Sequence, residues 1–409
     1  MTRCNMKILA IETSCDETAA AVVTKNSKEN YVKVLSNVVA SSLILHSKTG
    51  GIIPDIAARE QLKFIIPVIE KAIENCKLKI ENLDAIAVTY GPGLIGSLLI
   101  GVETAKTLSY LWNKPIIPVN HLFGHIYANW IYPQSSVLGS QLSDSSQSVH
   151  QLTGKLKTDK LESENRQQKT DNRILFPAIT LLVSGGHTDL LLMENHNNFK
   201  WLGGTLDDAA GEAFDKIGRL LNLPYPAGPT MEALAKNGNS KAFTFPRPMI
   251  GSKDFDFSFS GLKAAVWREV NRLKKGVAKE EGRPDNAQRR EHWREGLLLT
   301  GPQLKKEVIV DICASVQKSI IEVLVRKTLK AAKKYNVKSI LLGGGVTANQ
   351  KLRDELIHNT KYLIPDTEIF FPKKFLCTDN AAMIGAYAAF HPEEMSWNKI
   401  TANPELYFE

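Results

Sequence analysis

Residues 7–23 have the sequence KILAIETSCDETAAAVV, in which two apolar runs flank a polar turn. Short apolar runs bounded by turn residues are typical of strands, so this stretch predicts a β-hairpin. Its turn, residues 12–18, carries hydroxyl groups that can face a nucleotide and acids that can hold a cation or water. Residues 178–193, AITLLVSGGHTDLLLM, repeat the arrangement. The chain therefore contains two copies of a hairpin-led α/β unit, without a close sequence repeat.

Alternating strands and helices follow each hairpin. After the first hairpin the hydrophobic pattern predicts a strand at 31–39, a helix at 55–76, a strand at 85–90 and a helix at 96–112. After the second it predicts a strand at 339–342, a helix from Ala348, a strand at 368–371 and a helix from Asp379. We expect an N-terminal lobe over residues 6–120, with helix 379–391 packed on it, and a C-terminal lobe over 121–409.

Glycine-rich turns follow two of the later strands. In Ser184-Gly-Gly-His-Thr188 the two glycines let backbone come close to a ligand. Gly343-Gly-Gly345 precedes a helix, whose N-terminal amides favour anions. One such turn is weak evidence, because glycine hairpins are common. Together with the turn at 12–18, in two matched halves, they predict a phosphate or nucleotide site.

Bulk properties narrow the class of protein. The 409 residues fit two to three domains, and the net charge of +8 gives mild support for a polyanionic partner such as nucleic acid. A solvated basic surface explains the same charge. The five cysteines are odd in number and include no C-x-x-C, which indicates reduced thiols. We find no signal peptide or bilayer-length apolar run, and we expect the cytoplasm.

Two polar stretches interrupt the α/β pattern. Residues 134–173 are rich in Ser, Gln, Asn, Lys and Asp, so we expect a surface loop or disordered insert. Residues 274–304 carry many Lys and Arg residues, and we expect a second flexible insert there. A flexible basic arm and a solvated surface loop both fit the second stretch.

A histidine pair stands at the start of a predicted helix. His121 and His125 are four residues apart, which puts both imidazoles on one helical face as a possible pair of metal ligands. Residues 122–124 between them, Leu-Phe-Gly, provide no glutamate, whereas an H-E-x-x-H protease needs one as general base. If a metal binds, this pattern favours a positioning or Lewis-acid role; packing without a metal is the alternative.

Eight motifs give the chain a close resemblance to one family. They are Gly50-Gly-Ile-Ile-Pro54, Gly91-Pro-Gly-Leu-Ile-Gly-Ser97, His121-Leu-Phe-Gly-His125, Leu182-Val-Ser-Gly-Gly-His187, Asp207-Asp-Ala-Ala-Gly-Glu-Ala-Phe-Asp215, Asp256-Phe-Ser-Phe-Ser-Gly261, Gly343-Gly-Gly-Val-Thr-Ala-Asn349 and Cys377-Thr-Asp-Asn380. Together they resemble the TsaD family of tRNA N6-adenosine threonylcarbamoyltransferases, related to the Kae-type proteins. This family belongs to the superfamily of actin, hexokinase and the chaperone ATPases. The resemblance implies two duplicated RNase H-like lobes with a nucleotide and metal cleft between them.

The resemblance also implies roles for individual residues. It implies that one Fe²⁺ or Zn²⁺ ion is held by His121, His125 and Asp379, although an aspartate is also expected at a helix start. Threonylcarbamoyl-AMP would lie along Leu182, Val183, Ser184, Gly185 and Gly186. Asp215 and Asn349 would hold its ribose and base, and Gly228 would let backbone approach the adenosine. Glu232 is a weaker ribose candidate. Without the resemblance Asp215, Gly228 and Asn349 would be a helix-surface acid, a turn glycine and a helix-start amide.

The implied reaction transfers the threonylcarbamoyl group to N6 of adenosine 37 in tRNAs that read codons beginning with A, and it releases AMP. A proton acceptor is needed because an aromatic amine is a poor base. Asp16, Glu17 and His46 are candidates by polarity alone. The implied partners are tRNA, a TsaB-like paralogue, a TsaE-like ATPase and a synthase that supplies the adenylate.

The chain departs from the family pattern at a few positions. Gln61 and Ala227 stand where many relatives have histidine and glycine, and the alanine requires a negative φ.

The alternative functions are a phosphotransferase of the same superfamily, a metallopeptidase and a non-catalytic scaffold. A phosphotransferase would give the histidine pair no role. A metallopeptidase needs a general base beside the metal, which residues 122–124 do not provide. A scaffold is expected to lose ligands that this chain keeps.

Overall fold

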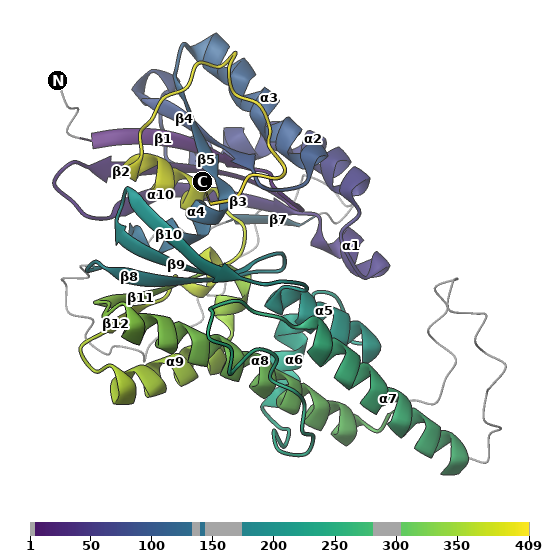
Figure 1. Cartoon of the computed structure of the whole chain (residues 1–409). Helices are drawn as coiled ribbons and strands as arrows, with labels where there is room; N and C mark the ends of the chain where they lie inside the picture. Colours follow the sequence, from purple (N-terminus) through teal and green to yellow (C-terminus); the bar gives the residue numbers. More distant parts are fainter. Residues whose placement is uncertain (1–4, 133–139, 144–173, 281–303, 409) are drawn as a thin grey trace, which may run out of the picture.

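A computed structural model describes residues 5–132, 140–143, 174–280 and 304–408 (Figure 1). Its helices are α1 (Leu43–Thr49), α2 (Pro54–Asn75), α3 (Ile95–Trp112), α4 (His121–Tyr127), α5 (Ala210–Leu220), α6 (Ala227–Ala235), α7 (Ser260–Glu280), α8 (Lys306–Lys334), α9 (Gln350–Leu363) and α10 (Ala381–Phe390). Within the described ranges, none of these helices combines the length and apolar character needed to cross a bilayer.

Two sheets share one strand order. The first contains β1 (Asn5–Glu12), β2 (Glu17–Asn26), β3 (Val32–Ser41), β4 (Ala85–Gly91), β5 (Ile116–Asn120), β6 (Ile131–Tyr132) and β7 (Ser140–Ser143). The second contains β8 (Ala178–Val183), β9 (Thr188–Asn195), β10 (Asn198–Gly204), β11 (Ser339–Gly343) and β12 (Glu368–Phe370). The strand order of the first sheet is β6-β3-β2-β1-β4-β5, with β7 also paired with β3, and that of the second sheet is β10-β9-β8-β11-β12. Apart from β6 and β7, the two orders correspond strand by strand.

In each sheet an antiparallel three-stranded meander is extended by two parallel strands on the side of its first strand. In the first sheet β1 pairs antiparallel with β2 and parallel with β4, and in the second β8 pairs antiparallel with β9 and parallel with β11. This repeated topology confirms the predicted duplication of an actin-like unit.

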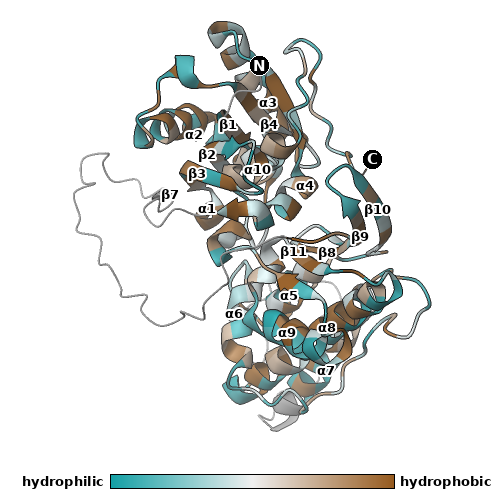
Figure 2. Ribbon diagram, turned by 90° about the vertical axis from the view of Figure 1, so that its left-hand side faces the viewer, coloured by the Kyte–Doolittle hydropathy of each residue, from teal (hydrophilic) through white to brown (hydrophobic). Residues whose placement is uncertain are grey.

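The strands are hydrophobic on both faces because helices cover both. In β1, Leu9 and Ile11 pack under α2 and α3, whereas Ile8 and Ala10 face the opposite side toward α10. Buried residues of α4 and α10 join one core with strands of both sheets, including Leu191 of β9. The two helices therefore lie between the sheets, while α5, α7, α8 and α9 cover the far face of the second sheet (Figure 2).

Several local predictions differ from the structure. The helix expected from Asp379 begins at Ala381, because the Asn380 side chain accepts the Met383 amide and caps it. The helix expected from Ala348 begins at Gln350 for the same reason, with Asn349 as its cap. Gly228 lies in the first turn of α6 instead of in a plain turn.

The two expected inserts fall mostly outside the described residues. Within the first, residues 140–143 form β7 against β3. Within the second, residues 274–280 continue α7, and the flexibility of the insert stays a prediction. The sequence there, KKGVAKE, contains one glycine and otherwise residues compatible with a helix, which allows the hydrogen-bond ladder to continue.

Candidate active site

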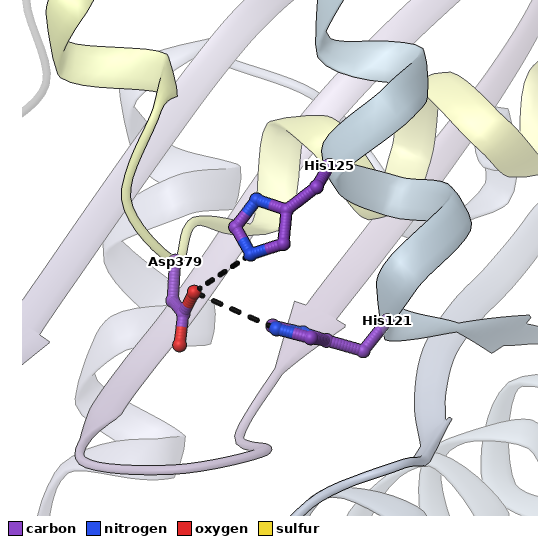
Figure 3. Close-up of side chains that lie close together, drawn as sticks. All are labelled: His121, His125 and Asp379. Carbon is purple, nitrogen blue, oxygen red and sulfur yellow. Dashed lines mark ion pairs between the residues drawn. The ribbon is translucent and has the colours of Figure 1, made fainter. Parts of the chain in front are cut away.

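The three metal-ligand candidates come from two parts of the fold. His121 and His125 lie in α4, and Asp379 directly precedes Asn380, the N-cap of α10. Asn120 caps α4 by accepting the Leu122 amide, which starts the helix at His121 and puts His125 one turn later on the same face. The Nε2 atoms of His121 and His125 lie 3.6 and 3.2 Å from the same Asp379 oxygen (Figure 3). Because Asn380 is the cap of α10, the Asp379 carboxylate is available to the histidines.

Contacts behind His121 fix which of its nitrogens faces Asp379. Its Nδ1 lies 3.2 Å from Oε2 of the fully buried Glu12 and 3.1 Å from the Ser14 hydroxyl. A carboxylate accepts, so Nδ1 carries a proton, and Nε2 is the nitrogen that faces Asp379. Glu12 is itself held, because Oε1 accepts the Ser14 amide and Oε2 accepts the Thr89 hydroxyl.

The charges of this cluster depend on one another. Burial lowers the pKa of His121, but the charges of Glu12 and Asp379 outweigh it and raise the pKa to about 9. Burial raises the pKa of Asp379, but His121 and His125 lower it to about 2. The pKa of His125 is lowered, mainly by burial. The site thus collects one anionic and two imidazole donors.

These residues fit a divalent metal ion. One ligand atom from each of the three lies within 4.8 Å of the others, and this is a group of the kind that holds metals. His125 is buried, its Nδ1 has no hydrogen-bond partner among the described residues, and its Nε2 has only the 3.2 Å contact with Asp379. Two imidazoles and one carboxylate with open positions suit Zn²⁺ or Fe²⁺.

A cavity of about 430 Å³ adjoins the cluster and is lined from both lobes. This volume lies in the range of small-molecule sites. The lining includes Asp16, Glu17, His121, His125, Ser184, Gly185, Gly186, His187, Asp215, Gly228, Glu232, Asn349 and Asp379. Leu182 and Val183 are buried in β8 behind the cavity, and His46 is buried outside its lining.

A contact outside the cavity lining links the lobes. The Arg219 guanidinium of α5 donates to the Gly50 carbonyl.

Three glycines leave open space along this cavity. A Cβ built on Gly185, Gly186 or Gly228 meets no protein atom within 4 Å. Since the protein itself does not require their small size, the space is available to a ligand. Of the turn amides, Ser184 donates to the His187 carbonyl and Gly186 to the Ser184 hydroxyl. The Gly185 amide has no acceptor among the described residues.

Side chains at the far end of the cavity are held by protein contacts. The Asp215 carboxylate accepts the Ala227 amide at 2.7 Å. Asn349 accepts the Leu352 amide and donates to Gln317 at 2.9 Å. Glu232 accepts the Gln350 amide. These side chains have structural roles, and the same contacts orient them toward the cavity.

Two groups near the cluster were missed as site residues by sequence reasoning. Glu12 was noted only as one acid of the first turn, and its contact with His121 joins positions 109 residues apart. His187 lines the cavity, and burial, with the charges of His121 and His125, lowers its pKa to about 4. His187 lies inside the quoted glycine turn, so its position there was an available signal.

The departures from the family pattern have structural explanations. Gln61 is buried on α2, and its amide donates to the carbonyls of Thr13, Cys15 and Glu17. It therefore holds the turn that contains Asp16. Ala227 is the first residue of α6, where φ is negative, so alanine fits.

A larger hollow, about 820 Å³, lies over α6, α8 and α9. Its charged groups largely pair with each other, as in the 2.7 Å contact between Arg247 and Glu322. The described metal-ligand cluster lies at the other cavity, which is therefore the better candidate for chemistry.

Comparison with known proteins identifies the family. The sequence model of TsaD, described as tRNA N6-adenosine threonylcarbamoyltransferase, matches residues 33–140 and 148–386. The chain belongs to the TsaD family. Relatives with that name include one from Listeria monocytogenes serotype 4b, 41% identical over 99% of this chain and 97% of its own, and one from Moorella thermoacetica, 41% identical over 98% and 96%.

TsaD membership makes the chain a transferase that acts in tRNA modification. A solved structure of HypF is similar in fold alone, with a TM-score of 0.51 and 11% identity, over 96% of this chain and 47% of that one. The likeness agrees with the duplicated actin-like topology, and the predicted fold class and family are both confirmed.

Proposed function

We propose that this TsaD protein transfers the threonylcarbamoyl group of threonylcarbamoyl-AMP to N6 of adenosine 37, in tRNAs that read codons beginning with A, and releases AMP. The observation that carries the proposal is the junction of a glycine-lined cavity with the His121, His125 and Asp379 cluster. One cavity thus offers space for an adenylate and a metal-ligand set at its end.

The donor would occupy the cavity with its phosphate and acyl group along Ser184, Gly185 and Gly186. The open space at Gly185 and Gly186 supports close backbone approach, and the Gly185 amide can donate to a ligand oxygen. Asp215, Gly228, Asn349 and, more weakly, Glu232 would contact the adenosine. Leu182 and Val183 would support this turn from β8, since both are fully buried.

His121, His125 and Asp379 would hold one Fe²⁺ or Zn²⁺ ion. Such an ion, when bound, supplies Lewis-acid polarisation and grips substrate oxygens. Glu12 would keep the His121 ring in the orientation and tautomer that a metal needs, as second-shell carboxylates commonly do.

The reaction breaks the bond between the carbamoyl carbon and the phosphate oxygen of the donor. The N6 lone pair attacks that carbon, AMP leaves with the bonding electrons, and N6 loses a proton. Asp16 is the best supported acceptor of this proton, because it lines the cavity and burial raises its pKa. Burial and the charges of Asp16 and Asp379 raise the pKa of Glu17 further, which favours its protonated form.

The partners would be tRNA, a TsaB-like paralogue, a TsaE-like ATPase and a separate synthase that supplies the donor. An exposed apolar face on α2 and α3 supports docking of the paralogue. Its residues are Leu62, Ile66, Ile95 and Leu99, which are 65, 47, 49 and 43% exposed. Exposed apolar patches of this kind are typical of protein interfaces, and a docked paralogue would bury these side chains.

Reconstitution tests the proposal. The purified chain, its partner subunits, unmodified tRNA, threonine, bicarbonate, ATP and the synthase are combined, and modified nucleoside is measured by mass spectrometry. We expect product with the wild type and at least a hundredfold loss with His121→Ala or Asp379→Ala. His358→Ala on the exposed face of α9 is the matched control. Full product from both cluster variants would show that the metal assignment is wrong.

A further inference from the structure

The C-terminal segment, residues 395–408, is anchored to the first sheet. The Met395 amide donates to the Ile116 carbonyl of β5 at 2.7 Å, and the Asn403 amide donates to the Tyr90 carbonyl of β4 at 2.7 Å. Ile400 is 1% exposed and belongs to the core under α2 and α3. The segment then passes Gly93, whose amide donates to the Pro404 carbonyl. Its described end comes to lie beside β9 and β10 (Figure 2).

Tyr407 contacts the helix that carries the histidine pair. Its carbonyl accepts the Asn120 side-chain amide at 2.8 Å. The other end of the same Asn120 side chain accepts the Leu122 amide at 2.8 Å and caps α4. Phe408 packs on Phe123 of that helix, with ring centroids 5.5 Å apart. The tail therefore holds the first turn of α4 through Asn120.

The same tyrosine contacts the second lobe. Its hydroxyl donates to Oδ1 of Asp189, the second residue of β9, and Trp201 of β10 donates to the same oxygen at 3.1 Å. Asp189 is 1% exposed. Its backbone directly follows the turn at 184–188, and the Tyr407 ring lies 6.3 Å from the His187 ring.

We propose that Tyr407 is a positioning residue for the transferase site. Its carbonyl fixes α4, its hydroxyl fixes β9, and the two contacts together set the histidine pair against the 184–187 turn. This role rests on the proposed function, which uses those two elements as the metal and donor sides of one site. The match to the family model ends at residue 386, so this segment lies outside it.

Hydrogen exchange of the full chain measures the coupling without metal or substrate. Tyr407→Phe removes only the hydroxyl contact. A chain ending at Leu406 also removes the carbonyl contact and the packing of Phe408 on Phe123, and it keeps the anchors at Asn403 and Pro404. We expect the shortened chain to exchange faster at 121–127 and 184–188. Tyr407→Phe should accelerate mainly 184–188, by about two- to tenfold for one lost hydrogen bond. Tyr362→Phe, an exposed tyrosine on α9, is the control.

Metal affinity and kinetics give a second readout. The shortened chain should bind Zn²⁺ about tenfold or more weakly in chelator competition, as other outer-shell changes do. It should also lose kcat for transfer. Unchanged exchange at both segments, or unchanged Zn²⁺ affinity and kcat with only a lower melting temperature, would overturn the positioning role.

The same measurements separate this inference from the proposed function. If the wild type neither binds metal nor modifies tRNA, the proposed function fails, and the exchange rates still decide whether Tyr407 couples α4 to the turn. If the wild type does both and the two variants match it in every measurement, the function stands and the Tyr407 role is wrong.

Discussion

Asp16 and Glu17 are consecutive residues of the first turn, yet their environments separate their roles. Asp16 is 7% exposed, and its main-chain carbonyl accepts both the amide and hydroxyl of Ser42. Burial raises the pKa of both carboxyls, and Glu17 is raised further by the neighbouring charges of Asp16 and Asp379. A base with a raised pKa is better matched to work near neutral pH.

Asp16→Asn should lower kcat for transfer by roughly a hundredfold or more, because an amide cannot accept the N6 proton. Wild-type activity should fall as the solution is acidified, and the midpoint should lie above that of an ordinary aspartate, since only the ionised carboxylate accepts. Single-turnover rates as a function of pH measure both effects. A variant with wild-type kcat would exclude Asp16 as the acceptor.

Gly185 and Gly228 offer a second test at the residue scale. Alanine at either position should leave the free energy of unfolding within about 1 kcal/mol of the wild type, because the added Cβ meets no protein atom. The same methyl group should raise the KM for the donor, since it occupies ligand space. Gly251→Ala is the matched control, because its Cβ also meets nothing and it lies outside the cavity lining. Equal donor KM in all three variants would contradict the assigned donor position.

Helix α10 places Asp379 by close contact with the first sheet. A Cβ built on Gly385 would lie 2.7 and 2.9 Å from the two methyl carbons of Val23 and 3.2 Å from Ala10. The glycine lets the helix approach β1 and β2, and Ile384 on the same helix meets Gly124 of α4. The spacing of α10 from the sheet and from α4 thus depends on two small residues.

Gly385→Ala should therefore destabilise the fold by about 1–3 kcal/mol through overpacking. Urea unfolding at constant m-value measures the change, with Gly251→Ala as the control. Stability equal to that of the wild type would show that α10 can shift without a loss in the free energy of unfolding. The inference that α10 holds Asp379 rigidly would then be wrong.

At the scale of the whole molecule, the layer between the sheets contains buried polar groups as well as apolar ones. The Tyr127 hydroxyl lies 2.9 Å from Nδ1 of His196, on the β9–β10 hairpin, and 2.6 Å from Nε2 of His391, after α10. The His196 ring stacks on Phe390, with centroids 4.6 Å apart. Burial lowers the pKa of His196 to about 4, with a further contribution from His391.

This layer should make the fold sensitive to acid. A histidine with a folded-state pKa near 4 stays neutral in the native protein, whereas the unfolded chain takes up a proton below its ordinary pKa of about 6.5. The contribution of His196 to the free energy of unfolding should therefore fall as the pH drops from about 6.5 to 4, and it should be constant above pH 6.5. His196→Phe should flatten that slope in urea titrations at pH 7 and 5. An unchanged slope would assign the acid sensitivity to other groups.

The apolar face of α2 and α3 predicts how the molecule assembles. Leu62→Lys with Ile66→Lys should raise the Kd for the TsaB-like paralogue at least tenfold, since charged side chains are excluded from interface cores. Calorimetry measures the affinity. Tyr362→Lys on exposed α9 is the control and should bind as the wild type does. Tight binding by the double variant would place the docking surface elsewhere.

The two hairpin-led units and most strand and helix positions could be predicted from local sequence patterns. This was possible because burial on both faces of β1 and β8 leaves continuous apolar runs, and because the hydrophobic pattern predicts α2 and α3. The resemblance in eight motifs added the family. Helix starts near residues 348 and 379 were misplaced by two residues, because the Asn349 and Asn380 caps depend on side-chain contacts.

Which side chains come together depends on the packing of the whole fold. Glu12 lies against His121, and Asp379 joins both histidines, because β1, α4 and the turn before α10 converge between the sheets. Tyr407 contacts Asn120 and Asp189, which are 287 and 218 residues away, from a segment that contains none of the eight motifs. Local hydrophobic periodicity reports which face of an element is buried, but it contains no information on which distant side chain that face will meet.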